Sequence, residues 1–195
     1  MPALKPQVRF LLRGSALVVG LLTLWWFVLL GPMLYLLQGA AGGFLLITEN
    51  PSGDWTVRVP LEQTLVATPQ RPAQQIHSVD FDIRRSDAIS FTFSLPVFWA
   101  IILAAPGVRR CLRPLLLGTF LMSVAELVLL VIFAQITARN AVSQLDGASD
   151  AGGKWVRHVG EYLIISVLPY AVPFVVALSL HRELRGEILP SMPAR

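Results

Sequence analysis

A single glutamate, Glu126, is the residue whose type and position most directly suggest chemistry. It lies 11 residues into an apolar stretch, residues 115–138, that holds no other charged side chain. If this stretch crosses a membrane, a rise of about 1.5 Å per residue places Glu126 near the bilayer midplane. An ionisable group at that depth costs roughly 2.5–3.5 kcal/mol and indicates a functional site.

The alternative for Glu126 is a protonated side chain that makes a hydrogen bond between helices. That bond would stabilise the helix packing and carry no chemistry. The candidate partners are Thr23, Tyr162, Ser166, Tyr170 and the carbonyls freed by Pro169 and Pro173.

Two further groups of residues are weaker candidates. Cys111 lies between Arg110 and Arg113, whose charges would favour the thiolate, but a nucleophile also needs a positioned base. His77, Asp80 and Asp82 could suggest a metal, yet His77 has the opposite strand parity to the two aspartates, and a solvated strand face explains the carboxylates. We therefore predict no catalytic residue, no metal site and no cofactor, and the chain is not expected to be an enzyme.

The composition determines the class of protein that must position these residues. Of 195 residues, 54% are hydrophobic and 14% are charged, whereas a soluble domain has about 25% charged residues. The apolar residues concentrate in four blocks, each near the roughly 20 residues that a spanning helix needs. We expect a mostly α-helical membrane protein with four transmembrane helices and a small antiparallel β region in its first outer loop.

The predicted segments follow from these blocks. The helices cover residues 10–38, 89–105, 115–138 and 162–180, and the second is preceded by a strand. The connecting segments are residues 1–9, 39–88, 106–114, 139–161 and 181–195.

The charged residues predict the orientation. Residues 1–13, 106–114 and 181–195 carry nine basic and two acidic side chains, and the other loops carry seven basic and nine acidic ones. The positive-inside rule then places both termini and the loop with Arg109, Arg110 and Arg113 in the cytoplasm. These three arginines would set the topology or contact membrane lipid. No nucleic-acid partner is expected, because no aromatic residues interleave with this basic cluster.

The outer loop at residues 39–88 is the largest segment expected outside the bilayer. Residues 55–61 predict a strand broken at Pro60, with Trp55 on its apolar face, and residues 65–67 could form another. Residues 78–84 alternate between apolar and polar side chains, which predicts a half-buried strand that includes Phe81. Alternation resumes at residues 89–94 around Phe91, so we expect a hairpin whose second strand runs into the second span.

The central third of the chain resembles the exosortase H-associated membrane proteins. The resemblance rests on the run Ser90-Phe-Thr-Phe-Ser-Leu-Pro96, the arginine-rich turn at residues 109–113 and the Leu115-Leu-Leu-Gly118 sequence. It implies an accessory role in the bacterial inner membrane, beside an exosortase that sorts proteins with a membrane-spanning tail. The family supplies no catalytic residues to transfer to this chain.

The leading hypothesis is a non-enzymatic accessory protein that docks another membrane protein, an exosortase or its substrates. It would dock through its outer loop and its helices, with Trp55, Phe81 and Phe91 as the docking residues. The alternative is a small transporter or channel subunit that uses Glu126.

Overall fold

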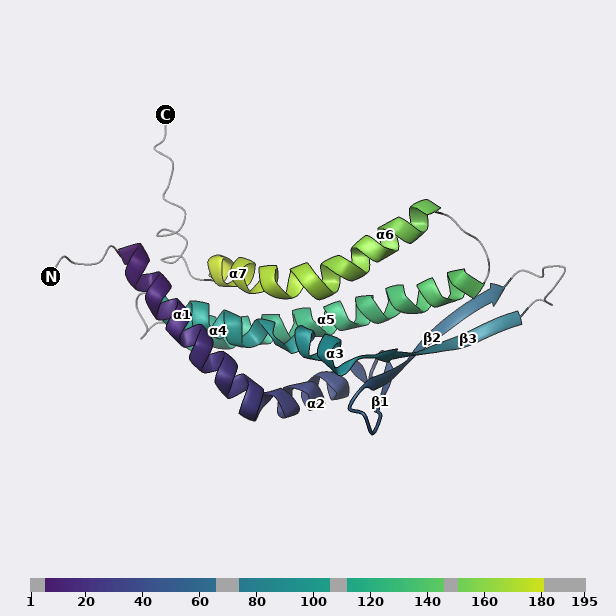
Figure 1. The fold of residues 1–195 in the computed structure, drawn as a ribbon, viewed down its shortest axis with the longest axis horizontal. Coiled ribbons are helices and arrows are strands. Elements are labelled where there is room, and N and C mark those ends of the chain that lie inside the picture. Colours follow the sequence, from purple (N-terminus) through teal and green to yellow (C-terminus); the bar gives the residue numbers. More distant parts are fainter. Residues whose placement is uncertain (1–5, 66–73, 106–111, 146–150, 181–195) are drawn as a thin grey trace, which may run out of the picture. The chain divides into compact units, whose positions relative to one another are not determined.

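The computed structural model describes residues 6–65, 74–105, 112–145 and 151–180 (Figure 1). The chain divides into two compact units. We call Met1–Met33, Thr92–Glu126 and Pro169–Arg195 the helical unit, and Leu34–Phe91 with Leu127–Leu168 the sheet unit.

The described residues include four helical stretches that are long and apolar enough to cross a membrane. They are Leu11–Ala41, Arg85–Ala104, Leu112–Gln144 and Trp155–Leu180. The prediction of four apolar helices with a small antiparallel sheet is thereby confirmed. Residues 109–111 and the predicted C-terminal segment lie outside the described residues.

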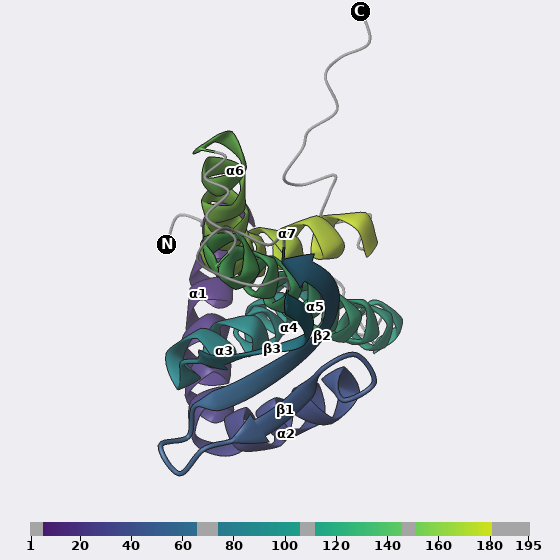
Figure 2. The same cartoon turned by 90° about the vertical axis from the view of Figure 1, so that its right-hand side faces the viewer.

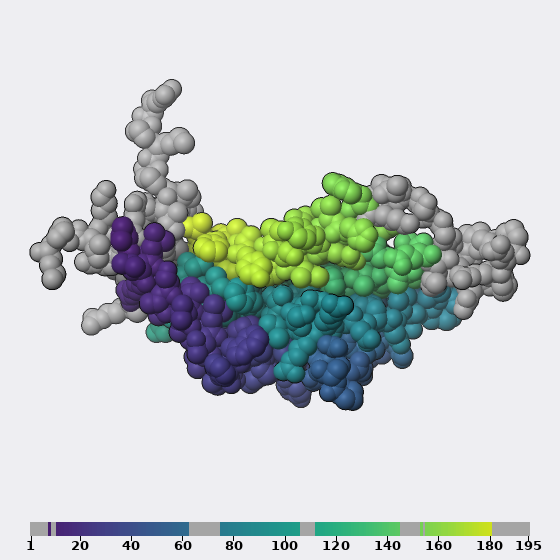
Figure 3. Space-filling view, viewed as in Figure 1, coloured from purple at the N-terminus to yellow at the C-terminus, as the bar shows by residue number. Residues whose placement is uncertain are grey.

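The first stretch is built from α1 (Pro6–Leu24), the π-helical turn η1 (Trp25–Leu29) and α2 (Leu30–Ala41). Large apolar side chains remain exposed along α1, whose surface is purple in Figure 3. Leu11, Leu12 and Val19 are 60–68% exposed. An amphipathic helix of a soluble protein would bury such residues in its apolar stripe.

The second stretch corrects the predicted strand at residues 89–94. It consists of α3 (Arg85–Thr92) and α4 (Ser94–Ala104), so the segment after the sheet is helical. The residues buried along it recur at the helical spacing of three or four, which outweighs the alternation that suggested a strand. They are Ala88, Phe91, Leu95, Phe98 and Ile102.

The remaining helices extend further than predicted. α5 runs from Leu112 to Leu145, and α6 (Ala151–Tyr162) continues through the π-helical turn η3 (Leu163–Val167) into α7 (Leu168–Leu180). Most of the expected loop at residues 139–161 is therefore helical. Ala138 and Val142, one turn apart and fully buried, explain why α5 continues beyond the apolar block.

The sheet has three antiparallel strands in the order β1-β2-β3 (Figure 2). They are β1 (Leu46–Glu49), which the sequence pattern did not predict, β2 (Trp55–Leu65) and β3 (Gln74–Ile83). Pro60 does not end β2, because an irregularity between Pro60 and Gln63 accommodates it within the strand. Of the further predicted strand at 65–67, Leu65 belongs to β2 and the other residues lie outside the described part.

One face of the sheet forms the core of the sheet unit. Trp55, Val57 and Val59 on β2 are at most 2% exposed, as is Ile83 on β3. They pack in one cluster with side chains of α2, α3, α5 and η3. The helical unit has a separate core, which contains Leu95, Phe98, Ile102, Ala105, Met122 and Ala177.

Candidate functional site

Glu126 lies in the helical unit, on α5, and its side chain is only 4% exposed. The hydroxyl of Ser94 donates a hydrogen bond to its Oε1 atom, and Ser94 is itself 2% exposed. This hydroxyl thus supplies a polar partner to an ionisable group that is almost completely removed from solvent.

The interruption between α3 and α4 explains why the carboxyl group is held at this point. Pro96 has no N–H and its ring clashes with a preceding carbonyl in a continuous helix. The helix is interrupted at Phe93, and α4 begins at Ser94. The Glu126 carboxyl group on α5 accepts a hydrogen bond from Ser94, the first residue of α4, and so contacts this helix at its interruption.

Aromatic side chains surround the interruption. The Phe93 ring meets the Trp25 ring edge-on, with centroids 5.9 Å apart, and the Tyr170 ring at 5.4 Å. The Trp25 Nε1 atom is buried and has no hydrogen-bond partner among the described residues. Phe93 therefore links η1 and α7 to the start of α4 within the helical unit.

The expected partners of Glu126 need correction. In the structure the bonded group is the Ser94 hydroxyl. Tyr170 packs against Phe93 and is 49% exposed, and the Thr23 hydroxyl donates to the carbonyl of Val19 in its own helix. Tyr162 and Ser166 belong to the sheet unit. Ser94 is not predicted as a partner from the sequence, because the alternation of residues 89–94 is typical of a strand.

This arrangement can accept hydrogen bonds or exchange one proton. General acid–base chemistry on a substrate would need a second positioned group. No group of three His, Cys, Asp or Glu side chains within the described ranges could hold a metal ion. The geometry accounts for Glu126 as the residue that stabilises an interrupted helix.

The predicted docking residues are core residues. Trp55 is 2% exposed and Phe91 is 1% exposed, and the Phe91 ring packs on Phe133 of α5 with centroids 5.8 Å apart. A partner cannot reach these two side chains, which corrects their expected role. Phe81 is only partly buried, at the margin of the same core.

The opposite face of the sheet is polar and exposed. Arg58 donates two hydrogen bonds to Asp80, from Nε to Oδ1 and from Nη2 to Oδ2, both at 2.7 Å. This guanidinium group lowers the pKa of Asp80 below its ordinary value, chiefly through the hydrogen bonds. Beside them, Thr56 donates to Asp82 at 2.7 Å. Asp80 and Asp82 are thus members of a solvated hydrogen-bonded face, as the sequence predicted.

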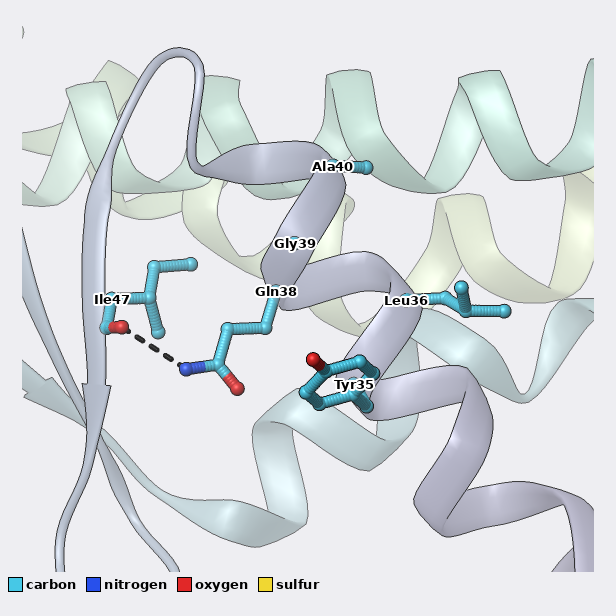
Figure 4. Close-up of a pocket in the computed structure, with 6 residues that line it drawn as sticks. All are labelled: Tyr35, Leu36, Gln38, Gly39, Ala40 and Ile47. Atoms are coloured by element: carbon cyan, nitrogen blue, oxygen red, sulfur yellow. Dashed lines mark hydrogen bonds between the residues drawn. The ribbon is translucent and has the colours of Figure 1, made fainter.

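A shallow groove of about 540 Å³ lies between α2 and β1 in the sheet unit (Figure 4). Within it, the Gln38 side chain donates from Nε2 to the backbone carbonyl of Ile47 at 3.0 Å. The exposed ring of Tyr35 lies beside Gln38 in Figure 4. This hydrogen bond attaches β1 to the end of α2.

The structure describes only one of the three arginines in the predicted cytoplasmic loop. Arg113 lies in the first turn of α5 and is exposed, and Arg109 and Arg110 lie outside the described residues. Their predicted roles in topology or lipid contact stay predictions.

Comparisons with models of protein families, with curated proteins and with solved structures find no match for this chain. The resemblance to the exosortase-associated proteins therefore rests on the residues that carry it.

Proposed function

We propose that the chain is a non-enzymatic accessory protein of a bacterial inner membrane, which binds another membrane protein through its sheet. The observation that carries this proposal is the contrast between the two sheet faces. One face is buried on helices through Trp55, Val57 and Val59, whereas the other displays Arg58, Asp80 and their neighbours to solvent. A sheet fixed in this way offers a partner a surface that is already ordered, which reduces the entropy lost on binding.

The membrane location is supported by the exposed apolar side chains of the candidate spans. Phe27 is 80% exposed, and Leu116 and Phe120 on α5 are 71% and 66% exposed. Soluble proteins rarely leave large apolar patches exposed to water, whereas lipid tails or another helix would cover them. The basic residues near the predicted cytoplasmic ends support the proposed orientation.

The partner proposed is an exosortase or one of its tailed substrates, on the strength of the sequence resemblance. Co-expression of the tagged full chain with an exosortase and a tailed substrate, followed by purification in mild detergent, tests this assignment. We expect the exosortase or the substrate to co-purify, and substrate sorting to decline when the chain is omitted. Normal sorting without the chain, together with no co-purification, would contradict the proposal.

A second candidate function is transport centred on Glu126. The specific observation in its favour is a buried carboxyl group at an interrupted helix, an arrangement that transporters use at their substrate sites. If the chain conducts protons or cations, Glu126→Gln should abolish flux in proteoliposomes while the protein remains folded. Under the accessory proposal the same variant retains sorting activity, so the two measurements separate the candidates.

A further inference from the structure

The two edges of the sheet differ in how their backbone groups are occupied. β1 forms one edge with only four residues, and the carbonyl of Ile47 on that edge accepts a hydrogen bond from Gln38 (Figure 4). β3 forms the other edge with ten residues (Figure 2). Exposed strand edges can pair with another chain, and proteins usually protect them with short strands, prolines or charged side chains, lysine above all. β3 contains neither proline nor lysine.

The register shows which backbone groups of β3 point outward. In an antiparallel pair, residues alternate between those that hydrogen-bond to the neighbouring strand and those whose groups point away. The Ile47 carbonyl bonds to Gln38, away from β2, and the pair of Asn50 and Asp54 closes the turn with a backbone bond of 2.8 Å. Both facts show that the backbone N–H and C=O groups of Thr56 and Arg58 point towards β1.

The residues of β3 opposite to these positions must then point their backbone groups away from β2. Thr56 pairs with Asp82, Arg58 with Asp80, and Pro60 with Ser78. Pro60 is an independent check on this parity. Its missing N–H falls on the β1 side, where the pairing of β1 ends at Arg58, so no bond of the sheet is lost.

Ser78, Asp80 and Asp82 therefore each present an N–H and a C=O group at the free edge. No backbone hydrogen bond from a described residue occupies these groups. Their side chains are exposed on the polar face, whereas Val79 and Phe81 between them are partly buried on the apolar face. The edge thus has a polar side and an apolar side.

The charge of the sheet indicates what would pair there. The three strands carry one arginine, Arg58, and one histidine, His77, against four acidic side chains. The acidic residues are Glu49, Glu62, Asp80 and Asp82. A second copy of β3 would bring its own aspartates beside Asp80 and Asp82, and like charges on adjacent strands are destabilising. A strand with lysine or arginine at alternate positions would be attracted.

We propose that β3 binds an extended segment of the partner by strand addition, and that this segment alternates basic and apolar residues. The basic side chains would lie beside Asp80 and Asp82, and the apolar ones beside Val79 and Phe81. Main-chain hydrogen bonds supply the affinity in this mode of recognition, and alternate side chains supply the specificity. The inference deepens the proposed function, because it names the chemistry that the partner presents.

The test uses the full chain in detergent and fluorescent peptides that alternate lysine and valine. Fluorescence anisotropy should show saturable binding that weakens with added salt. A peptide of the same composition in scrambled order, and one that alternates glutamate and valine, should bind far more weakly. Equal binding of the alternating and scrambled lysine peptides would overturn the inference.

Two protein variants test the edge itself. Ser78→Pro removes one outward N–H and keeps the bonds between β2 and β3, so binding should weaken about fivefold, whereas Ser78→Thr keeps the donor and should bind normally. Asp82→Asn should weaken binding more than Glu62→Gln, the same loss of charge on the neighbouring strand. Unchanged binding by both Ser78→Pro and Asp82→Asn would contradict strand addition.

The outcomes also separate this inference from the proposed function. If the exosortase or its substrate co-purifies but the full chain binds no alternating basic peptide, strand addition is wrong and the accessory role remains. If the peptide binds and neither protein co-purifies, only the assignment of the partner fails. A disulfide between two copies of Ser78→Cys in liposomes, with no peptide binding, would show a dimer interface and overturn the inference.

Discussion

The helical unit and the sheet unit each contain a carboxyl group held by hydrogen bonds, in opposite surroundings. Glu126 and its donor Ser94 are 4% and 2% exposed, whereas the side chains of Arg58 and Asp80 are 55% and 44% exposed. Water can replace the partner of an exposed group but not that of a buried one. The buried hydrogen bond between Ser94 and Glu126 should therefore stabilise the fold more than the exposed ion pair between Arg58 and Asp80.

The largest effect is expected at Trp55, in the core of the sheet unit. Trp55→Ala removes a side chain that is 2% exposed and should lower the free energy of unfolding by about 4 kcal/mol. Thermal unfolding in detergent, followed by circular dichroism, measures the loss. Thr56→Ala, at the next position on the solvated face, is the matched control. Similar stability of the two variants would mean that Trp55 is not a core residue.

Next in size is Gly118→Ala in the helical unit. A Cβ atom at Gly118 would lie 2.7 and 2.8 Å from Cε1 and Cε2 of Phe98, and closer still to its Cζ atom. Phe98 is fully buried, so we expect a loss of about 3 kcal/mol in the same unfolding measurement. Gly20→Ala, where nothing lies within 4 Å, should instead be neutral or slightly stabilising.

Ser94→Ala tests the buried contact directly. It leaves the Glu126 carboxyl group with one partner fewer in a site without solvent, which should reduce stability by about 2 kcal/mol. Glu126→Gln keeps an acceptor oxygen and should cost less. A double-mutant cycle of Ser94→Ala with Glu126→Gln measures the coupling between the two side chains. A coupling free energy near zero would contradict a stabilising hydrogen bond between Ser94 and Glu126.

The smallest effect belongs to the exposed ion pair. Arg58→Ala should hardly change stability at neutral pH, because solvent screens the pair. Its signature is the pKa of Asp80, which is lowered beside Arg58 and should return towards its ordinary value in the variant. Asp80 therefore stabilises the folded state above its unfolded pKa, and this contribution disappears as the pH falls through the folded pKa. NMR titration of Asp80 in both proteins checks the direction, and identical titrations would contradict it.

The sequence predicts the helices better than their ends or partners. Uninterrupted apolar stretches and the alternation of Trp55, Val57 and Val59 are strong local signals, and both appear in the structure. Residues 89–94 alternate as a strand does, but tertiary burial of Phe91 and Leu95 selects the helix. The partner of Glu126 was missed for the same reason, since Ser94 approaches it only when that segment is helical. β1 was missed because four exposed or half-buried residues carry little pattern.

The close approach of Phe98 to Gly118 has a mechanical consequence. The ring of Phe98 occupies the space that a side chain at position 118 would fill. Sliding α4 along α5 by one helical turn, about 5.4 Å, would bring that ring towards Leu115 or Met122, where side chains already fill the core. Because Gly118 has no side chain, the Phe98 ring fits against α5 at this position along the helix axis. It fixes how far α4 lies along α5, and with it the height at which Ser94 meets Glu126.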